Sequence, residues 1–144
     1  PYTTLFRSNA SYKLTILPEA LKDFYGNTND TLNVSLKTKK RADFSVLDLT
    51  INNLERYPAI VQLIDENEKV EKSVILTETN RHIFEYVKPG TYFVKVIYDD
   101  NENGVWDSGD YLLQKQPEIV KYSRESFELR ANWDVVQPIS LPEF

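Results

Sequence analysis

Apolar side chains occupy every second position in most of the segments that can form regular structure. The pattern occurs at residues 12–16, 32–36, 47–51, 57–63, 92–98 and 127–133, and a looser apolar set at 135–141 ends the chain. A period of two gives each strand one buried and one wet face, and repeated short strands separated by turns are typical of an antiparallel β-sandwich. Only residues 18–25 hint at a helical turn. The pattern therefore predicts an all-β chain.

The composition agrees with a folded, strand-rich protein. Apolar residues make up 41% of the chain and charged residues 27%, an ordinary globular balance. No apolar run approaches the roughly 20 residues that span a bilayer, so we expect no membrane-spanning segment. The chain has no cysteine and one histidine. These counts exclude a disulfide framework, a thiolate metal site and a zinc site built from several imidazoles.

A basic, apolar-poor stretch at residues 37–41 is the best candidate for a domain boundary. Residues 9–40 have room for only two or three strands, too few to bury a core, so we expect them to be the C-terminal part of a truncated domain. Residues 41–144 are long enough for one complete sandwich.

The beginning of the chain does not resemble a natural start. Methionine is absent, and residues 1–8 (PYTTLFRS) resemble the in-frame translation of a high-throughput sequencing adapter. Such a segment is excluded from fold reasoning. We therefore expect residues 9–144 to be the C-terminal part of a longer protein.

The negative charge of the chain is concentrated in one segment. The chain has 22 acidic and 17 basic residues, a net charge of −5 that argues against a nucleic-acid partner. Five acidic residues and no basic residue lie within residues 99–110, so the rest of the chain holds 17 of each sign. Like charges at this density repel one another unless a cation is present.

The acidic segment has the ligand spacing of an EF-hand-type calcium loop. Oxygen-bearing side chains stand at loop positions 1, 3, 5, 9 and 12, and Gly104 at position 6 permits a sharp turn. The predicted Ca²⁺ ligands are the side chains of Asp99, Asn101, Asn103, Asp107 and Asp110, with the main-chain carbonyl of Val105. Asp107 can act through a water. A solvated acidic turn is the open alternative.

Two features distinguish this loop from those of calcium sensors. Asp110 stands where a bidentate glutamate is usual, which favours weaker binding or tolerance of Mg²⁺. The loop also follows a predicted strand, residues 92–98, so there is no helix pair for the ion to open. We therefore expect the ion to stabilise the fold.

Other candidates for chemistry are weaker. His82 lies in a strand-like segment and has the pattern of a structural residue, and no Gly-x-Ser-x-Gly elbow is present. Trp106 lies inside the acidic loop. Trp133 lies at a position that the alternation of residues 127–133 assigns to the core-facing side of the strand. We therefore expect both indoles to pack against the protein rather than to bind a sugar ring. No catalytic residue is predicted.

Two parts of the chain resemble bacterial envelope modules. Residues 12–38, with the element Asp23-x-x-Gly26-Asn27, resemble the second half of an Ig-like domain of surface-layer proteins. Residues 43–141 resemble the prealbumin-like sandwich of carboxypeptidase regulatory-like and collagen-adhesin B-type modules. The carrying pattern is Phe84-x-x-Val87-x-Pro89-Gly90-x-Tyr92-x-Val94-x-Val96. The segments 116–118 and 130–134 also resemble the C-terminus of envelope-associated Ig-like proteins of unknown function.

The resemblance implies a non-catalytic, calcium-stabilised structural or adhesive module of a secreted or surface-anchored bacterial protein. It implies an extracellular or cell-envelope location, an anchor in the unseen N-terminal part, and a protein or glycan partner at the cell surface. The alternative is a carbohydrate-binding module that accompanies a missing catalytic domain, which would need exposed coplanar aromatic rings. An enzyme is the third hypothesis, and it would need a cleft that gathers His82 with carboxylates.

Overall fold

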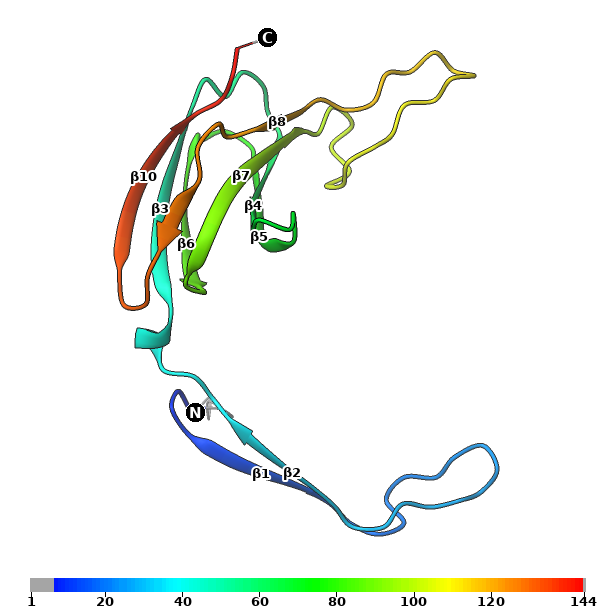
Figure 1. The fold of residues 1–144 in the computed structure, drawn as a ribbon. Helices are drawn as coiled ribbons and strands as arrows, with labels where there is room; N and C mark the ends of the chain where they lie inside the picture. The colour runs from blue at the N-terminus through cyan, green and yellow to red at the C-terminus, as the bar shows by residue number, and fades with distance from the viewer. Residues whose placement is uncertain (1–6, 144) are drawn as a thin grey trace. The chain divides into compact units, whose positions relative to one another are not determined.

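The computed structural model describes residues 7–143 and shows an all-β protein of several sheets (Figure 1). The chain divides into two compact units, Pro1–Arg41 and Ala42–Phe144. This division falls at the end of the basic stretch at residues 37–41. Most of the predicted adapter-derived segment, residues 1–6, lies outside the described residues, so that prediction stays untested. Among the described residues, no helix reaches the length and apolarity that a bilayer crossing requires.

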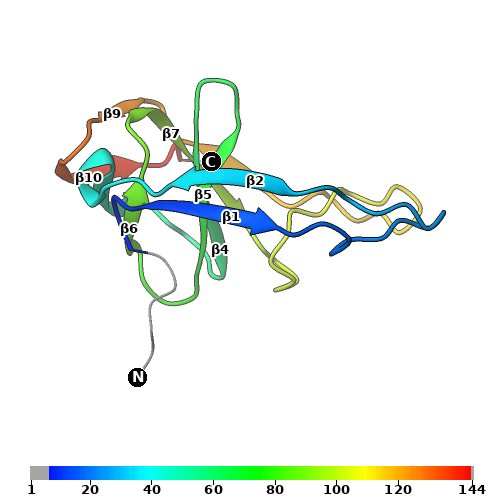
Figure 2. The same cartoon turned by 90° about the horizontal axis from the view of Figure 1, so that it is seen from below.

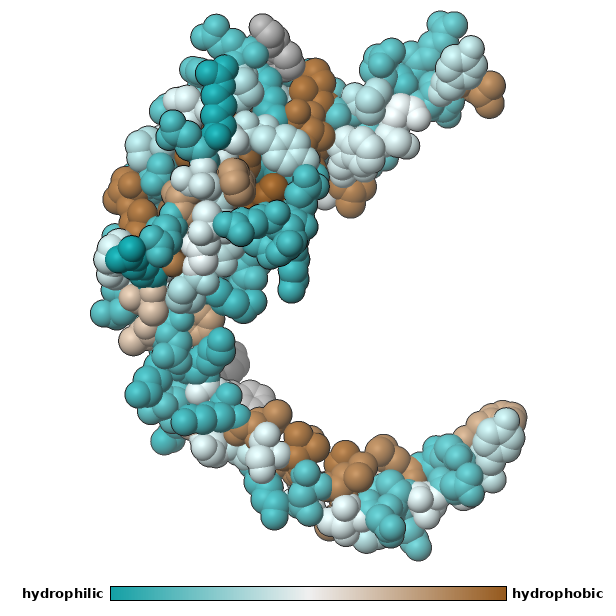
Figure 3. All heavy atoms as spheres, in the orientation of Figure 1, coloured by the Kyte–Doolittle hydropathy of each residue, from teal (hydrophilic) through white to brown (hydrophobic). Residues whose placement is uncertain are grey.

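The first unit contains one antiparallel hairpin, formed by β1 (Ser11–Ile16) and β2 (Leu32–Lys37). The register places Tyr12 opposite Leu36, Leu14 opposite Val34 and Ile16 opposite Leu32. Because side chains alternate between the faces of a strand, these six apolar side chains share one face. That face is largely uncovered, since the exposed fractions of Leu14, Leu32, Val34 and Leu36 are 44–51%. Brown apolar side chains line one side of the hairpin in Figure 3.

The hint of a helical turn at residues 18–25 is wrong. The chain makes turns there, with an isolated bridge between Lys22 and Thr28. Glu19 has a φ of 62°, which lies in the left-handed region and interrupts a right-handed helix. The carboxylate of Asp23 instead accepts hydrogen bonds from the main-chain and side-chain amides of Asn27, both at 2.8 Å.

The strands of the second unit form two main sheets, which Figure 2 shows from a second direction. A 3-10 helix, η1 (Arg41–Asp43), precedes the first strand. One sheet has the order β10–β3–β6, with β10 at Asp134–Ser140, β3 at Ser45–Asn52 and β6 at Arg81–Val87. The other has the order β5–β4–β7–β8, with β5 at Val70–Leu76, β4 at Ala59–Ile64, β7 at Gly90–Tyr98 and β8 at Val120–Tyr122. The short strand β9 (Phe127–Leu129) also pairs with β7.

One strand pair differs from the predicted antiparallel arrangement. β10 runs parallel to β3, from Asp134 opposite Val46 to Ser140 opposite Asn52. After β9 the chain turns at Asn132, whose φ is 60°, and enters the sheet that contains β3. This turn also ends the strand predicted at 127–133. The predicted core-facing position of Trp133 is therefore wrong, and its exposed fraction is 50%.

A buried core draws side chains from both sheets of the second unit. Its members are Leu47, Leu49, Ile51, Ala59, Val61, Leu63, Leu76, Phe84, Val87, Tyr92, Val94, Val96, Tyr98, Leu129, Ile139 and Leu141. Residues at every second position of β3 and β7 belong to this set, which confirms the alternation predicted for these two strands. β7 ends at Tyr98, a core residue that immediately precedes the acidic segment.

An ion pair between β3 and β6 makes one part of the stability dependent on pH. The Nε of Arg81 donates to Oδ1 of Asp48 at 2.7 Å, and its Nη2 donates to Oδ2. These hydrogen bonds, and the charge of Arg81, lower the pKa of Asp48 from its ordinary 3.8. Because the folded-state pKa is the lower one, the pair stabilises the fold above the unfolded-state pKa. This contribution is lost as the pH falls through the folded-state pKa.

We therefore expect Asp48→Asn to lower the melting temperature at pH 7, with the difference from the parent protein shrinking below about pH 4. Thermal unfolding of both proteins between pH 7 and pH 2.5 measures the difference. A difference that stays constant over this range would contradict the assignment to the ionised pair.

Candidate functional site

The acidic segment lies in the long connection between β7 and β8, which projects from the sheet (Figure 1). We call residues 99–118 the β7–β8 loop. Its outer turn is closed by a bridge between Asp110 and Lys115. Gly109 is required beside this bridge, because a Cβ atom there would lie 2.8 Å from the carbonyl oxygen of Lys115.

Asp99 is buried at the base of the loop, with an exposed fraction of 2%. Its Oδ1 accepts a hydrogen bond from the amide of Asn103 at 3.1 Å, and its Oδ2 accepts one from the amide of Gly104 at 2.8 Å. Gly104 has a φ of 78°, a conformation that glycine adopts without steric strain. Asp99 therefore holds residues 99–104 in a tight turn.

Three of the predicted ligand residues meet in the loop. The Nδ2 of Asn103 donates to Oδ2 of Asp107 at 2.6 Å, and the Nδ2 of Asn101 donates to the same oxygen. Rotating an asparagine amide by half a turn exchanges its nitrogen and oxygen positions. Both amide oxygens now accept main-chain amides, Oδ1 of Asn101 that of Asn103 at 3.1 Å and Oδ1 of Asn103 that of Val105 at 2.9 Å, so turning an oxygen toward Asp107 would break that hydrogen bond. We call Asn101, Asn103 and Asp107 the amide–carboxylate cluster.

The structure does not bring Asp110 into this cluster. Its Oδ1 accepts hydrogen bonds from the amides of Leu112 at 2.8 Å and Leu113 at 3.0 Å, so its carboxylate organises the outer turn. The amide of Val105 donates to Oδ1 of Asn103 at 2.9 Å, which places Val105 beside the cluster. A cation site that includes Asp110 would need the outer turn to rearrange.

Glu118 is a loop residue that the sequence reasoning did not assign to the site. Its exposed fraction is only 5%. Its Oε1 accepts a hydrogen bond from the amide of Asp100, and its Oε2 accepts one from the amide of Asp107, both at 3.0 Å. Glu118 lies outside the twelve-residue calcium-loop spacing at 99–110, so that pattern carries no signal for it.

The oxygen atoms that the loop can offer as metal ligands are of the chemical type that Ca²⁺ prefers. Among the described residues, no three His, Cys, Asp or Glu side chains gather into a group that could hold a metal. A cation here would therefore depend on one or two carboxylates together with amide and main-chain oxygens. Such an all-oxygen set suits Ca²⁺ or Mg²⁺ rather than zinc, and its small number of charged ligands favours weak binding.

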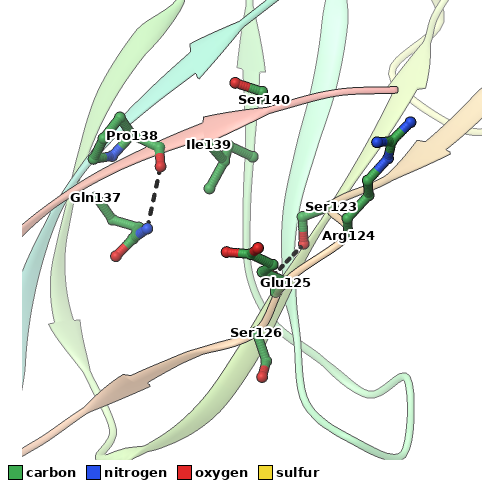
Figure 4. Close-up of a pocket in the computed structure, with 8 residues that line it drawn as sticks. All are labelled: Ser123, Arg124, Glu125, Ser126, Gln137, Pro138, Ile139 and Ser140. Atoms are coloured by element: carbon green, nitrogen blue, oxygen red, sulfur yellow. Dashed lines mark hydrogen bonds between the residues drawn. The ribbon is translucent and has the colours of Figure 1, made fainter. Parts of the chain in front are cut away.

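A separate polar pocket of about 280 Å³ lies between β10 and the segment that connects β8 to β9 (Figure 4). Its lining consists of Ser123, Arg124, Glu125, Ser126, Gln137, Pro138, Ile139 and Ser140. The Oγ of Ser123 accepts a hydrogen bond from the amide of Val94 and donates one to the carbonyl of Glu125. None of these lining residues offers an aromatic ring for a sugar to stack on.

The remaining candidates lie on the surface or against the core. Trp106, like Trp133, is about half-exposed, so the expectation that both indoles pack inside is wrong. The guanidinium of Arg130 lies 5.1 Å from the centre of the Trp133 ring. The ring of His82 packs edge-on against that of Phe84, with 4.7 Å between the ring centres.

Comparisons with known proteins find no matching family model, no matching curated protein and no matching solved structure. What the structure establishes is an all-β protein with mostly antiparallel strands in several sheets. The resemblances to Ig-like and prealbumin-like modules stay predictions.

Proposed function

We propose that the second unit is a prealbumin-like β-sandwich stabilised by Ca²⁺, and that it serves as a non-catalytic structural or adhesive module. The observation that supports this proposal is the amide–carboxylate cluster. It lies in the segment that carries the whole net charge of the chain. The ligands are Asp99, Asn101, Asn103 and Asp107 with the Val105 carbonyl, and Asp110 joins them if the outer turn rearranges.

The expected stabilisation follows from binding to the folded state alone. A ligand at ten times its Kd stabilises a fold by about 1.4 kcal/mol, and at a hundred times its Kd by about 2.7 kcal/mol. Extracellular calcium modules have Kd values of roughly 10⁻⁴–10⁻³ M, so millimolar Ca²⁺ gives a useful gain. The proposal therefore places the protein outside the cell or on the cell envelope, where a surface protein or glycan would be its partner.

Thermal unfolding of the chain in millimolar CaCl₂, millimolar MgCl₂ and chelator tests this proposal. We expect Ca²⁺ to raise the melting temperature by about 5 °C relative to chelator, from a gain near 1 kcal/mol in a domain of this size. Asp99→Ala and Asp107→Ala should abolish the rise, because each removes a ligand carboxylate.

Glu102→Gln is the matched control, because it removes one negative charge from the same loop without removing a predicted ligand. It should keep the calcium-dependent rise. A melting temperature of the parent protein that is equal in all three solutions would contradict the calcium proposal. A rise lost equally in Glu102→Gln would indicate general charge screening in place of a defined site.

The second candidate function, a carbohydrate-binding module, is favoured by the half-exposed ring of Trp133. Retention of the protein on insoluble polysaccharide, lost in Trp133→Ala, would support it. Against it, Arg130 already stacks near this ring, and stacking of a sugar would have to compete with that contact.

A further inference from the structure

We infer that Glu118 is the positioning residue of the β7–β8 loop: its buried carboxylate holds in place the backbone that carries the amide–carboxylate cluster before any cation binds. The positioning stands on contacts within the chain, and its consequence for Ca²⁺ affinity rests on the proposed function. Glu118 need not contact the ion. It acts through the backbone that carries the ligands.

The two carboxylate oxygens of Glu118 accept hydrogen bonds from the main chain at the two ends of the ligand-bearing segment, residues 100–107. Oε1 accepts the amide of Asp100 and Oε2 accepts the amide of Asp107, each at 3.0 Å. These two residues bracket Asn101 and Asn103 in the sequence. A carboxylate that accepts amide hydrogens forms charge-assisted bonds, which are stronger than neutral ones. One side chain thus sets the separation between the two ends of the ligand-bearing segment.

The main chain of Glu118 is bonded to the loop, and the residue that follows it is bonded to the sheet. Its amide donates to the carbonyl of Asp107 at 3.1 Å, and its carbonyl accepts the indole Nε1 of Trp106 at 3.1 Å. The next residue, Ile119, accepts the amide of Tyr98 at 3.0 Å at the end of β7. Functional groups supported from rigid elements keep their geometry better than groups supported only by a loop. Glu118 therefore transfers the rigidity of β7 and β8 to the loop.

The side chain of Glu118 is almost fully removed from solvent. A buried charged group is costly unless hydrogen bonds compensate it, and here each carboxylate oxygen has a main-chain donor. Asp110 is the useful contrast. Its carboxylate bonds only to amides of the outer turn, so it organises that turn and has no hydrogen bond to either end of the cluster.

A pre-formed loop lowers the ordering cost of binding, so the loss of Glu118 should weaken Ca²⁺ binding without removing a ligand. Outer-shell partners of metal ligands typically change metal affinity by 10–100-fold when they are replaced. We expect Glu118→Gln to raise the Ca²⁺ Kd by about tenfold. Glu102→Gln should change the Kd much less, because it removes one negative charge from the same loop and Glu102 is not a predicted ligand.

The experiment compares the full chain with Glu118→Gln and the matched control Glu102→Gln by two measurements. Hydrogen exchange at the amides of Asp100 and Asp107, followed by NMR in chelator, reports positioning without any metal. Titration calorimetry with CaCl₂ gives the Kd. In Glu118→Gln, whose side chain keeps only one acceptor oxygen, we expect exchange of at least one of the two amides to accelerate at least about tenfold, while amides of the core strands stay protected. Glu102→Gln should leave both amides protected.

The outcomes separate the two proposals. If the parent protein binds no Ca²⁺ but Glu118→Gln releases at least one of the two amides, positioning stands and the calcium proposal fails. If the two amides stay protected in Glu118→Gln, or its Ca²⁺ Kd equals that of the parent, the positioning role is overturned. If Glu118→Gln does not fold, Glu118→Asp replaces it, because that variant keeps the charge and shortens its reach by one methylene.

Discussion

Replacing Leu47 by alanine should lower the free energy of unfolding of the second unit by about 2–5 kcal/mol. Leu47 is fully buried in β3, the central strand of its sheet, between Phe84 of β6 and Val135 of β10. Neighbours on both sides restrict collapse into the space that the smaller side chain leaves, so the cavity cost adds to the lost transfer energy. Domains are typically stable by about 5–15 kcal/mol, so this loss is a large fraction of the total.

Urea unfolding followed by circular dichroism measures this change. The matched control is Val136→Ala on the neighbouring strand β10, where the valine is 72% exposed. It should change the free energy of unfolding by no more than about 0.5 kcal/mol. Equal effects of the two substitutions would show that the core does not lie where the structure places it.

Replacing Glu55 by alanine should destabilise the second unit by about 1–3 kcal/mol, because it withdraws the carboxylate from a buried ammonium group. The side chain of Lys121 on β8 is only 6% exposed, and its Nζ donates to Oε1 of Glu55 at 3.0 Å. The same ammonium lies 5.9 Å from the centre of the Tyr98 ring, which supplies part of its stabilisation. The Tyr98 ring thus offsets some of the cost of removing the Glu55 carboxylate from the Lys121 ammonium. The expected loss of stability is therefore smaller than for a buried charge with no neighbouring group.

A double-mutant cycle with Lys121→Met checks the cause. Methionine keeps the length of the lysine stem without its charge, and the Glu55 side chain, 37% exposed, can then be solvated by water. Adding Glu55→Ala to Lys121→Met should therefore cost much less than Glu55→Ala alone, with a coupling energy of about 1 kcal/mol or more. Additive effects would assign the loss to packing of the Glu55 side chain and contradict the ion-pair explanation.

The strands that could be predicted from the sequence are those in which apolar and polar residues alternate over several positions. They include β1 and β2, whose apolar face is largely uncovered. In β3 and β7 the residues at every second position belong to the core, and β4 contributes Ala59, Val61 and Leu63 although its other face is also buried. β5 was not predicted, since its pattern is interrupted by Glu71, Lys72 and Ser73 and most of its side chains are at least partly exposed. β8 has three residues, which is too short for a periodic signal. Alternation identifies a strand only where it continues over enough consecutive residues.

The calcium-loop prediction illustrates the same limit for the site. The spacing identified Asn101, Asn103 and Asp107, which the structure brings together, and it also included Asp110, whose carboxylate faces its own turn. The spacing covers only residues 99–110, so it carried no information about Glu118, which lies at the other end of the β7–β8 loop, just before β8. Whether the cluster binds Ca²⁺ stays a prediction, which the melting experiment decides.

The sequence by itself determined that this chain is all-β, where its core-facing strands lie, and which segment concentrates the negative charge. These properties are local, because they depend on alternation and on the charges of neighbouring residues. The parallel pairing of β10 with β3, the exposure of Trp133 and the closure of the loop by Glu118 were decided only by the tertiary structure. Each joins segments that are distant in the chain or depends on one turn, such as that at Asn132, and no local pattern encodes such contacts.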